Sequence, residues 1–148
     1  MTYKYSTQNM TDAMARAVVL SQSISVKQSI EIANAIRKKP VAKARVYLQN
    51  VIDAKQPVAY RRFNGDVGHK KGRVGPGRFP IKAAQSMLKA LELVVSNAKD
   101  KSLNEESLYI FNIVIQKGPQ NPRPGRFRGR TAKNTHIEIV VSEGKKHD

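Results

Sequence analysis

Residues 107–142 read SLYIFNIVIQKGPQNPRPGRFRGRTAKNTHIEIVVS, in which a basic segment separates two apolar runs. The first run, 107–116, and the second, 135–142, have the length and the β-branched content of β-strands. Apolar residues at alternate positions predict a strongly apolar face on a strand. In the first run these are Tyr109, Phe111, Ile113 and Ile115, and in the second they are Ile137, Ile139 and Val141.

The segment between the two runs, 117–133, is called the arm. It contains six cationic residues, three prolines and three glycines, and it has no carboxylate. The cations repel one another, and the prolines and glycines disfavour both a helix and an apolar core. If the flanking runs pair antiparallel, the arm is a basic β-hairpin that projects from a folded body. That shape suits insertion between the phosphates of an anionic partner.

The composition of the whole chain also indicates a polyanionic partner. Its 148 residues include 27 Lys and Arg against 11 Asp and Glu, and the formal charge of +16 exceeds what solubility alone requires. Nucleic acid and an anionic membrane are the two candidates. The sequence shows neither a cationic amphipathic helix nor an apolar span of about 20 residues, so no membrane partner is expected. The N-terminus lacks a secretory pattern, and we expect a cytoplasmic protein.

The sequence shows no set of residues suited to catalysis or metal binding. The absence of cysteine excludes disulfides, thiolate nucleophiles and zinc fingers. The glycine-rich stretch 72–77 lacks the residues and the strand context of a nucleotide-binding loop. The histidines stand alone and the carboxylates are scattered, so we expect no metal, no cofactor and no small-molecule substrate. We therefore expect a protein that is not an enzyme.

The N-terminal half predicts a strand and two helices. Residues 16–21 are short and β-branched, as in a strand. Ser25 and Gln28 have the spacing of a capping box, which predicts a helix that begins there and ends just before Pro40. A second helix follows and is stopped by Pro57.

Residues 56–78 interrupt this helical periodicity and are called the basic loop. Proline and glycine recur throughout, which predicts a long irregular segment of the kind that is usually functional or disordered. A single acid, Asp66, accompanies its six cations, so the basic loop predicts a second cationic surface, separate from the arm. Aromatic residues lie among or next to these cations at Tyr60, Phe63 and Phe79.

The third helix is the clearest element of the sequence. Pro80 suits its first turn, and apolar residues then recur at steps of three and four. The stripe expected to form the core is Ile81, Ala84, Leu88, Leu91, Val95 and Ala98. The order of elements, a strand, three helices and two strands, predicts an α+β fold. We expect a single domain, 1–148, with three helices packed on a small antiparallel sheet and a long basic β-hairpin arm.

Several short motifs resemble one protein family along nearly the whole chain. They are Arg37-Lys38-Lys39-Pro40-Val41, Ser96-Asn97-Ala98, Leu108-Tyr109-Ile110, Lys117-Gly118-Pro119, Arg128-Gly129-Arg130 and Thr135-His136-Ile137-Glu138. With the helix after Ser25, they resemble the universal large-subunit ribosomal protein family that is twenty-second in the bacterial count. The stretch 57–77 resembles an insertion of archaeal and eukaryotic members, and Met14-Ala15-Arg16-Ala17 favours the archaeal branch.

The resemblance implies a structural component of the large ribosomal subunit in the cytoplasm. Members of the family bind large-subunit rRNA, aid its assembly beside neighbouring ribosomal proteins, and send a hairpin into the wall of the polypeptide exit tunnel. The residues expected to bind rRNA are Lys27, Lys39, Arg61, Arg62, Asn64, His69, Lys70, Lys71, Arg73, Arg78, Lys82, Lys117, Arg123, Arg126, Arg128, Arg130, Lys133 and His136. The arm tip expected to face the tunnel and the nascent polypeptide comprises Pro122, Arg123, Pro124, Gly125, Arg126 and Phe127.

Two other classes of function remain open from the residues alone. A DNA-architectural protein could clamp a duplex with a basic β-arm and a proline wedge, usually as a dimer with paired arms. An RNA-processing enzyme would need a catalytic carboxylate or histidine, and no candidate is visible. Arginine predominates in the arm, and its planar guanidinium both binds phosphate and stacks on bases, which favours RNA.

Overall fold

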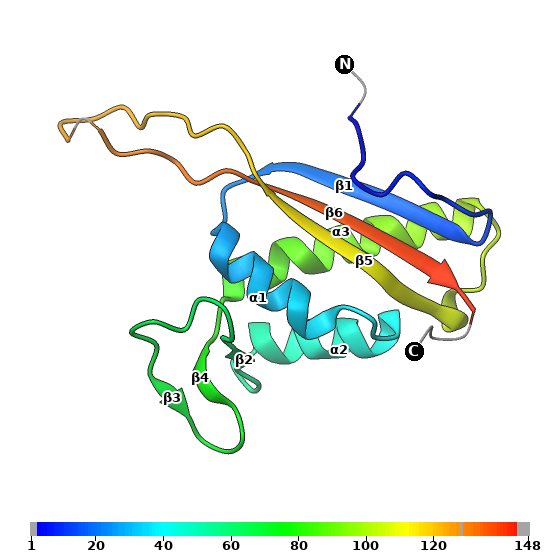
Figure 1. Cartoon of the computed structure of the whole chain (residues 1–148), viewed down its shortest axis with the longest axis horizontal. Helices are drawn as coiled ribbons and strands as arrows, with labels where there is room; N and C mark the ends of the chain where they lie inside the picture. Colours follow the sequence, from blue (N-terminus) through cyan, green and yellow to red (C-terminus); the bar gives the residue numbers. More distant parts are fainter. Residues whose placement is uncertain (1–2, 128, 145–148) are drawn as a thin grey trace.

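The computed structural model describes residues 3–127 and 129–144 of the chain. Its main sheet has three antiparallel strands within these residues, in the order β1 (Met14–Gln22), β6 (Thr135–Glu143) and β5 (Leu108–Lys117) (Figure 1). The antiparallel pairing of the two apolar runs is confirmed. β6 is central, and nearly all of its residues are buried.

A β-bulge in β5 changes which side chains face the core. The register of pairing with β6 shifts by one residue between Ile110 and Asn112, so Phe111 is an extra residue. As a result, Ile110 and Ile113 are both buried, whereas Phe111 is 38% exposed. The alternating apolar face predicted for 107–116 is therefore wrong at Phe111, because regular alternation does not continue through a bulge.

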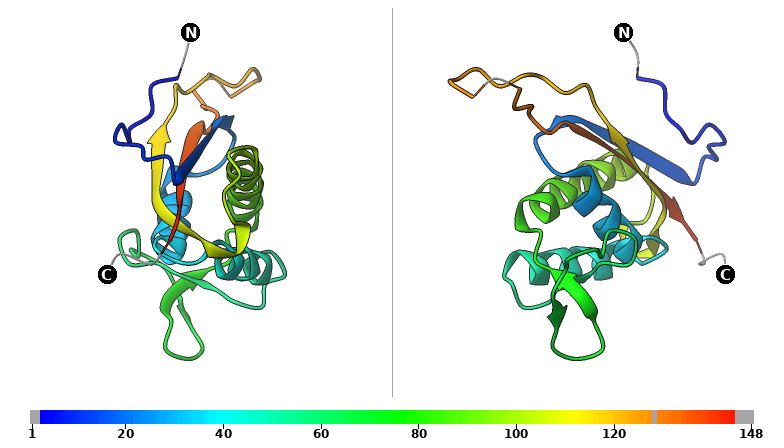
Figure 2. Two further views of the ribbon diagram at one scale, coloured as in Figure 1. Left: turned by 90° about the vertical axis from the view of Figure 1, so that its right-hand side faces the viewer. Right: turned by 60° about the vertical axis from the view of Figure 1, so that its left-hand side comes forward.

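Three α-helices lie within the described ranges, as predicted: α1 (Val26–Ile36), α2 (Val41–Ile52) and α3 (Ile81–Asp100). They pack against the main sheet and one another (Figures 1 and 2), with α3 on β1 and β6, α1 on β5, and α2 on α3. Pro40 separates α1 from α2, because proline has no N–H and disfavours a helical residue before it. A membrane crossing would need a longer or more apolar helix than any in the described residues.

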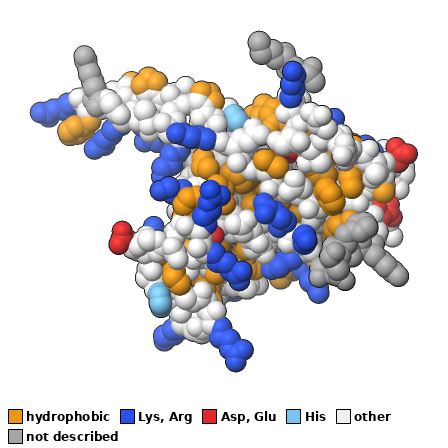
Figure 3. All heavy atoms as spheres, in the orientation of Figure 1, with side chains coloured by type: hydrophobic (Ala, Val, Ile, Leu, Met, Phe, Trp, Pro, Cys, Tyr) orange, Lys and Arg blue, Asp and Glu red, His pale blue; other side chains and the backbone are white. Residues whose placement is uncertain are grey.

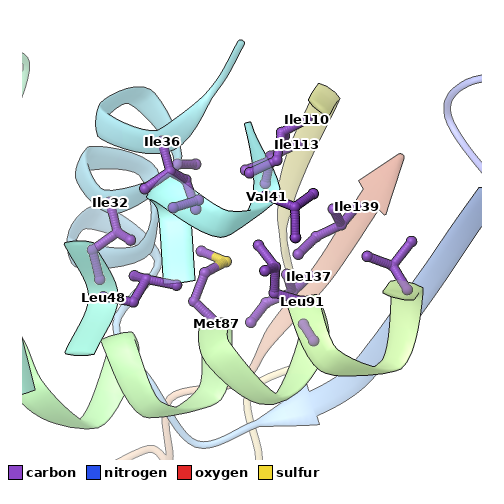
Figure 4. Packing of buried hydrophobic residues seen from close by; sticks show 14 of the residues in the cluster. Ile32, Ile36, Val41, Leu48, Met87, Leu91, Ile110, Ile113, Ile137 and Ile139 are labelled. Carbon is purple, nitrogen blue, oxygen red and sulfur yellow. The ribbon is translucent and has the colours of Figure 1, made fainter. Parts of the chain in front are cut away.

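The core lies between the helices and the main sheet (Figure 4). The helices contribute Ile32 and Ile36 from α1, Leu48 from α2, and Met87 and Leu91 from α3, all fully buried. Each of these side chains stabilises the fold by about 1.5–3 kcal/mol through its burial. The largest buried apolar side chains from the main sheet are Leu108, Ile110, Ile113, Ile137 and Ile139.

The buried face of α3 is wider than the predicted stripe. Ile81, at the start of the stripe, is 41% exposed. Met87 and Val94 lie outside the stripe but are buried, because α3 contacts both α2 and the main sheet. Four residues of the stripe are buried as predicted: Ala84, Leu91, Val95 and Ala98.

The basic loop is more ordered than predicted. It contains the short strands β2 (Val58–Ala59), β3 (His69–Lys70) and β4 (Gly75–Arg78), which form a second antiparallel sheet in the order β2-β4-β3. Strands this short cannot display an alternating pattern in the sequence. Gly77 permits the close pairing, because an added Cβ would lie 3.1 Å from the Val58 carbonyl oxygen.

Ser25 occupies the N-cap position of α1, but the predicted capping box is wrong. Within the described residues, its side chain makes no capping hydrogen bond. Ser29 donates both its N–H and its hydroxyl to the Ser25 carbonyl oxygen, each at 2.9 Å. Gln28, the other member of the predicted box, lines a surface cavity. The first amides of α1 therefore lack the side-chain acceptor that the sequence predicted.

A buried carboxylate attaches the N-terminal segment to the main sheet. Glu138 of β6 is 1% exposed and accepts the N–H of Ser6 at 3.0 Å and that of Thr7 at 3.2 Å. It also accepts the Tyr3 hydroxyl at 3.4 Å. The pKa of Tyr3 is raised, first by burial of the phenol and then by the charge of Glu138.

Candidate nucleic-acid interface

The arm leaves the main sheet between β5 and β6 and extends well beyond the body (Figure 1). Its two sides run antiparallel. The Arg123 N–H donates to the Arg130 carbonyl oxygen at 2.8 Å, and the Ala132 N–H donates to that of Asn121 at 2.8 Å. The three prolines supply no N–H, so a regular ladder of hydrogen bonds cannot run along the arm.

The tip of the arm presents cations and one aromatic ring to solvent. Arg123, Arg126 and Arg130 are exposed, and Arg128 lies outside the described residues. Phe127 is 66% exposed, and the Arg130 guanidinium carbon lies 4.8 Å from the centre of its ring. Guanidinium groups beside an exposed ring can bind phosphates and stack on bases.

The base of the arm is tightly packed around Gly118, which is buried. An added Cβ would lie 2.7 Å from Asn134 Cγ and 2.8 Å from His136 Nε2. The Asn134 side chain donates to the Pro119 carbonyl oxygen at 3.0 Å, and His136 Nδ1 accepts the N–H of Ser21 at 2.9 Å. His136, predicted to bind rRNA, is therefore half-buried and already engaged within the protein.

The first turn of the basic loop is anchored by Glu31 of α1. Its carboxylate is 1% exposed and accepts three backbone N–H groups, from Arg61 at 3.2 Å, Arg62 at 2.9 Å and Phe63 at 2.7 Å. Hydrogen bonds to a carboxylate are roughly twice as strong as neutral ones. Because the backbone satisfies Glu31, the side chains of Arg61 and Arg62 are both exposed.

Sequence reasoning missed Glu31, which it treated as one of several scattered acids. The only signal in the sequence was its position between Ile30 and Ile32, next to the buried face of α1. The acceptor role depends on residues that follow thirty positions later, so no local pattern could have revealed it.

The predicted residues of the basic loop lie at the surface. Figure 3 shows Lys and Arg side chains both along the arm and over the second sheet, formed by β2, β3 and β4. The acidic groups visible in this view lie mostly at the end of the body opposite the arm. Lys70 Nζ lies 5.4 Å from the centre of the Phe79 ring. Arg78 donates to the Asp66 carbonyl oxygen at 3.3 Å. The exposed members of the predicted set here are Arg61, Arg62, Asn64, His69, Lys70, Lys71, Arg73 and Arg78.

The arm and the basic loop meet at the start of α1, which corrects the expectation of two separate surfaces. A cavity of about 500 Å³, called the α1 cavity, is lined by cations from three parts of the chain. Lys27 comes from α1, Arg62 and Arg78 come from the basic loop, and Lys133 comes from the arm. Its other lining residues are Ser25, Gln28, Tyr60, Phe63, Gly65 and Val67.

A neighbouring cavity of about 420 Å³ continues this surface toward the arm. It shares Ser25, Gln28 and Lys133 with the α1 cavity and adds Lys82 and Arg123. Lys82 is positioned by a hydrogen bond from Nζ to the Ser23 hydroxyl at 2.8 Å. The structure thus brings predicted residues from α1, α3, the basic loop and the arm to one side of the molecule.

Some predicted residues lie outside these two cavities. Lys39 lines a third cavity, of about 390 Å³, together with Arg61 and Arg73 of the basic loop. Its Nζ lies 4.9 Å from the centre of the Tyr47 ring. Lys117 is exposed at the end of β5, where the arm begins.

Two acids of the body, Asp53 and Glu105, are paired with cations. Lys99 Nζ lies 2.8 Å from Glu105, and this hydrogen bond is the main cause of the lowered pKa of Glu105. Lys55 lowers the pKa of Asp53 in the same way, from 3.1 Å. Within the described residues, no three His, Asp or Glu side chains are grouped so that they could hold a metal ion.

Comparison with known proteins relates the chain to one family. The family model described as ribosomal protein L22p/L17e matches residues 17–142. The large ribosomal subunit protein uL22 of Methanococcoides burtonii is 38% identical over 146 residues, which cover 95% of this chain and 96% of the relative. The uL22 protein of Picrophilus torridus is 40% identical over 144 residues, which cover 94% of this chain and 95% of the relative. The uL22 protein of Ignicoccus hospitalis is 37% identical over an alignment of 155 residues, which covers 96% of this chain and 98% of the relative.

Proposed function

This chain belongs to the ribosomal protein L22p/L17e family, and we propose from this that it is a structural constituent of the large ribosomal subunit that binds rRNA. The observation that carries the proposal is the match over residues 17–142, which include the basic loop, the α1 cavity and the arm. The family consists of structural rather than enzymatic components. The DNA-architectural alternative is not supported, because the similar proteins are named as large-subunit ribosomal proteins.

The proposed rRNA contacts are the cations predicted from the sequence on the arm, the basic loop and α1. Binding to phosphates releases condensed counterions, which supplies most of the affinity of such a surface. Three cations of the basic loop and α1 and one of the arm already share the α1 cavity, which supports a continuous contact rather than two separate anchors. For His136 we propose a supporting role at the base of the arm, because Ser21 already occupies its Nδ1.

The arm tip, from Pro122 to Phe127, is proposed to line the polypeptide exit tunnel and to face the nascent polypeptide. Its support is the extension of the arm away from the body and the exposure of Phe127 and the arginines there. Neighbouring large-subunit proteins are proposed as further partners, in keeping with the names of the relatives.

The test is cosedimentation of the full chain with large ribosomal subunits. The expected result is that the protein pellets with the subunits and stays bound through a moderate salt wash. Protein that remains in the supernatant, or that is displaced by duplex DNA as readily as by structured RNA, would contradict the proposal.

A further inference from the structure

The two edges of the main sheet differ in how far they are covered. On β1, side chains from α3 and its C-terminal end cap carbonyl groups that face away from β6. The Asn97 side chain donates to the Arg16 carbonyl oxygen at 2.9 Å, and Lys101 Nζ donates to that of Met14 at 2.9 Å. Capping of this kind keeps an edge strand from pairing with another chain. The first half of the β1 edge is therefore closed.

The edge at β5 is covered by backbone only where the strand begins. There the linker between α1 and α2 pairs with it. The Ile110 N–H donates to the Lys39 carbonyl oxygen at 2.9 Å, and the Lys38 N–H donates to that of Ile110 at 3.0 Å. Pro40 also forms an antiparallel bridge with Tyr109. The linker thus acts as a short additional strand, and α2 begins directly after it.

Further along β5, outward-facing backbone groups are left open. The Gly118 N–H donates to the Asn134 carbonyl oxygen at 3.0 Å, so every second residue before Gly118 bonds to β6 and those between face away from it. The outward-facing residues are Ile113, Ile115 and Lys117. The Ile113 carbonyl oxygen accepts from the Arg37 side chain at 3.0 Å. Within residues 3–127 and 129–144, the N–H and C=O groups of Ile115 and Lys117 have no partner.

A groove of about 410 Å³, called the edge groove, lies between residues 112–115 of β5 and α1 (Figure 1). Ile30 and Ala33 of α1 give it an apolar side, and the exposed cations Arg37 and Arg62 also line it. An extended peptide suits such a groove, because its N–H and C=O groups alternate as those of the edge do. A phosphate can accept from an edge N–H but cannot donate to an edge C=O, so the edge favours peptide over an RNA backbone.

We propose that an extended, acidic segment of a neighbouring large-subunit protein adds to β5 as a further strand in the edge groove. The segment is acidic because Arg37 and Arg62 line the groove, and complementary charge selects the partner. A second copy of this chain is a poor occupant, because the net charge of +16 makes copies repel one another. The inference rests on the proposed place in the large subunit, and it assigns a site and a binding mode to the contact with a neighbouring protein.

The test is hydrogen exchange, followed by mass spectrometry, of the full chain in three states. The chain is compared alone, bound to protein-free large-subunit rRNA, and incorporated into complete large subunits. The outward amides of Ile115 and Lys117 should exchange rapidly in the first two states and at least about 10-fold more slowly in complete subunits. Slowing with rRNA alone would assign the edge to RNA and overturn the proposal, as would unchanged exchange in complete subunits.

A pair of variants tests the outward N–H itself. Ile115→Pro removes it, and proline is tolerated on an edge strand where the N–H faces outward. Ile115→Val is the matched control, because it also shortens the side chain but keeps the N–H. A photoreactive benzoylphenylalanine replaces Asn34, which is exposed beside the groove, in both variants. Crosslinking to another protein of complete subunits is expected with Ile115→Val and should fall by about 5-fold with Ile115→Pro.

Equal crosslinking by the two variants, or crosslinks to rRNA alone, would contradict strand addition. The exchange comparison uses the unmodified chain, so it decides the question even if Ile115→Pro does not fold. Cosedimentation separates this inference from the proposed function. If the chain binds subunits but the amides of Ile115 and Lys117 exchange as in the chain alone, strand addition is wrong and the proposed function stands. If the chain fails to bind subunits, both are wrong.

Discussion

The carboxylate of Glu31 accepts the backbone N–H of Phe63 at 2.7 Å, and through this hydrogen bond α1 fixes the first turn of the basic loop. The loop is otherwise short of apolar anchors, since most of its residues are exposed. A single buried acid thus positions a cationic surface by binding its backbone. The guanidinium groups of Arg61 and Arg62 stay exposed as a result.

Replacing Glu31 by alanine should destabilise the protein and loosen the basic loop. Three backbone N–H groups would be left without their charged acceptor, so the free energy of unfolding should fall by about 2–4 kcal/mol. Urea unfolding measures this decrease, and trypsin should cut faster after Arg61 and Arg62. Glu31→Gln keeps one acceptor oxygen and should cost less. A decrease no larger than that of Glu92→Ala, on the exposed side of α3, would show that Glu31 is not an anchor.

Gly118→Ala should disturb the base of the arm. The new Cβ would lie 2.7–2.8 Å from Asn134 and His136, and relieving such overpacking typically costs about 1–3 kcal/mol. Thermal unfolding should show a lower melting temperature, and the amide signals of Ser21 and Asn134 should move. Gly68→Ala is the matched control, because an added Cβ there meets no described atom within 4 Å. Equal melting temperatures for the two variants would rule out tight packing at Gly118.

Binding to large-subunit rRNA should weaken steeply with salt. If the protein neutralises about six to ten phosphates, its affinity should fall by about 10³–10⁵-fold between 50 and 200 mM salt. The logarithm of the affinity, plotted against the logarithm of the salt concentration, has a slope that counts the neutralised phosphates. Substituting glutamine for Arg123 or Arg130 should reduce the magnitude of this slope by about 1 for each phosphate that is no longer neutralised. Lys55→Gln should not change the slope, because Lys55 is paired with Asp53. A slope near zero for the unmodified protein would contradict phosphate binding.

Tyr60 should make the fold sensitive to alkaline pH. Burial raises the pKa of Tyr60 above its ordinary value of 10.0, and nearby Glu31 adds to the effect while Arg78 opposes it. Because the folded state holds the phenolic proton more tightly, the stability linked to this group is complete below pH 10.0 and is lost as the pH rises through the raised pKa. Urea unfolding from about pH 8.5 to 11 should therefore show a steeper loss of stability for the unmodified protein than for Tyr60→Phe. Identical slopes would mean that Tyr60 does not titrate differently in the folded state.

The helices and the main sheet could be predicted because their signals are local. Pro40 marks the boundary between α1 and α2, and the periodic apolar residues of α3 identify the longest helix. The two apolar runs identify β5 and β6 in the same way. These features depend on residues a few positions apart, which a single sequence displays directly.

What the sequence did not reveal depends on residues that are far apart. The bulge at Phe111 follows from the register with β6. The second sheet pairs the strands β2, β3 and β4, which are too short to show an alternating pattern of apolar residues. Lys27 lines the α1 cavity together with Lys133, which lies more than a hundred residues later in the chain. The capping box is absent because, within the described residues, the Ser25 side chain makes no capping hydrogen bond, and Gln28 lines the α1 cavity. The sequence identifies the cationic residues, but only the fold shows which of them lie together.

The proline content of the arm has a consequence for the protein before it meets RNA. An extended segment with a continuous row of free N–H groups can pair with a second copy and start aggregation. Proline at positions 119, 122 and 124 interrupts that row, and the positive charges on neighbouring copies repel one another. Newly made molecules should therefore remain apart from each other in solution until a polyanion neutralises their arms.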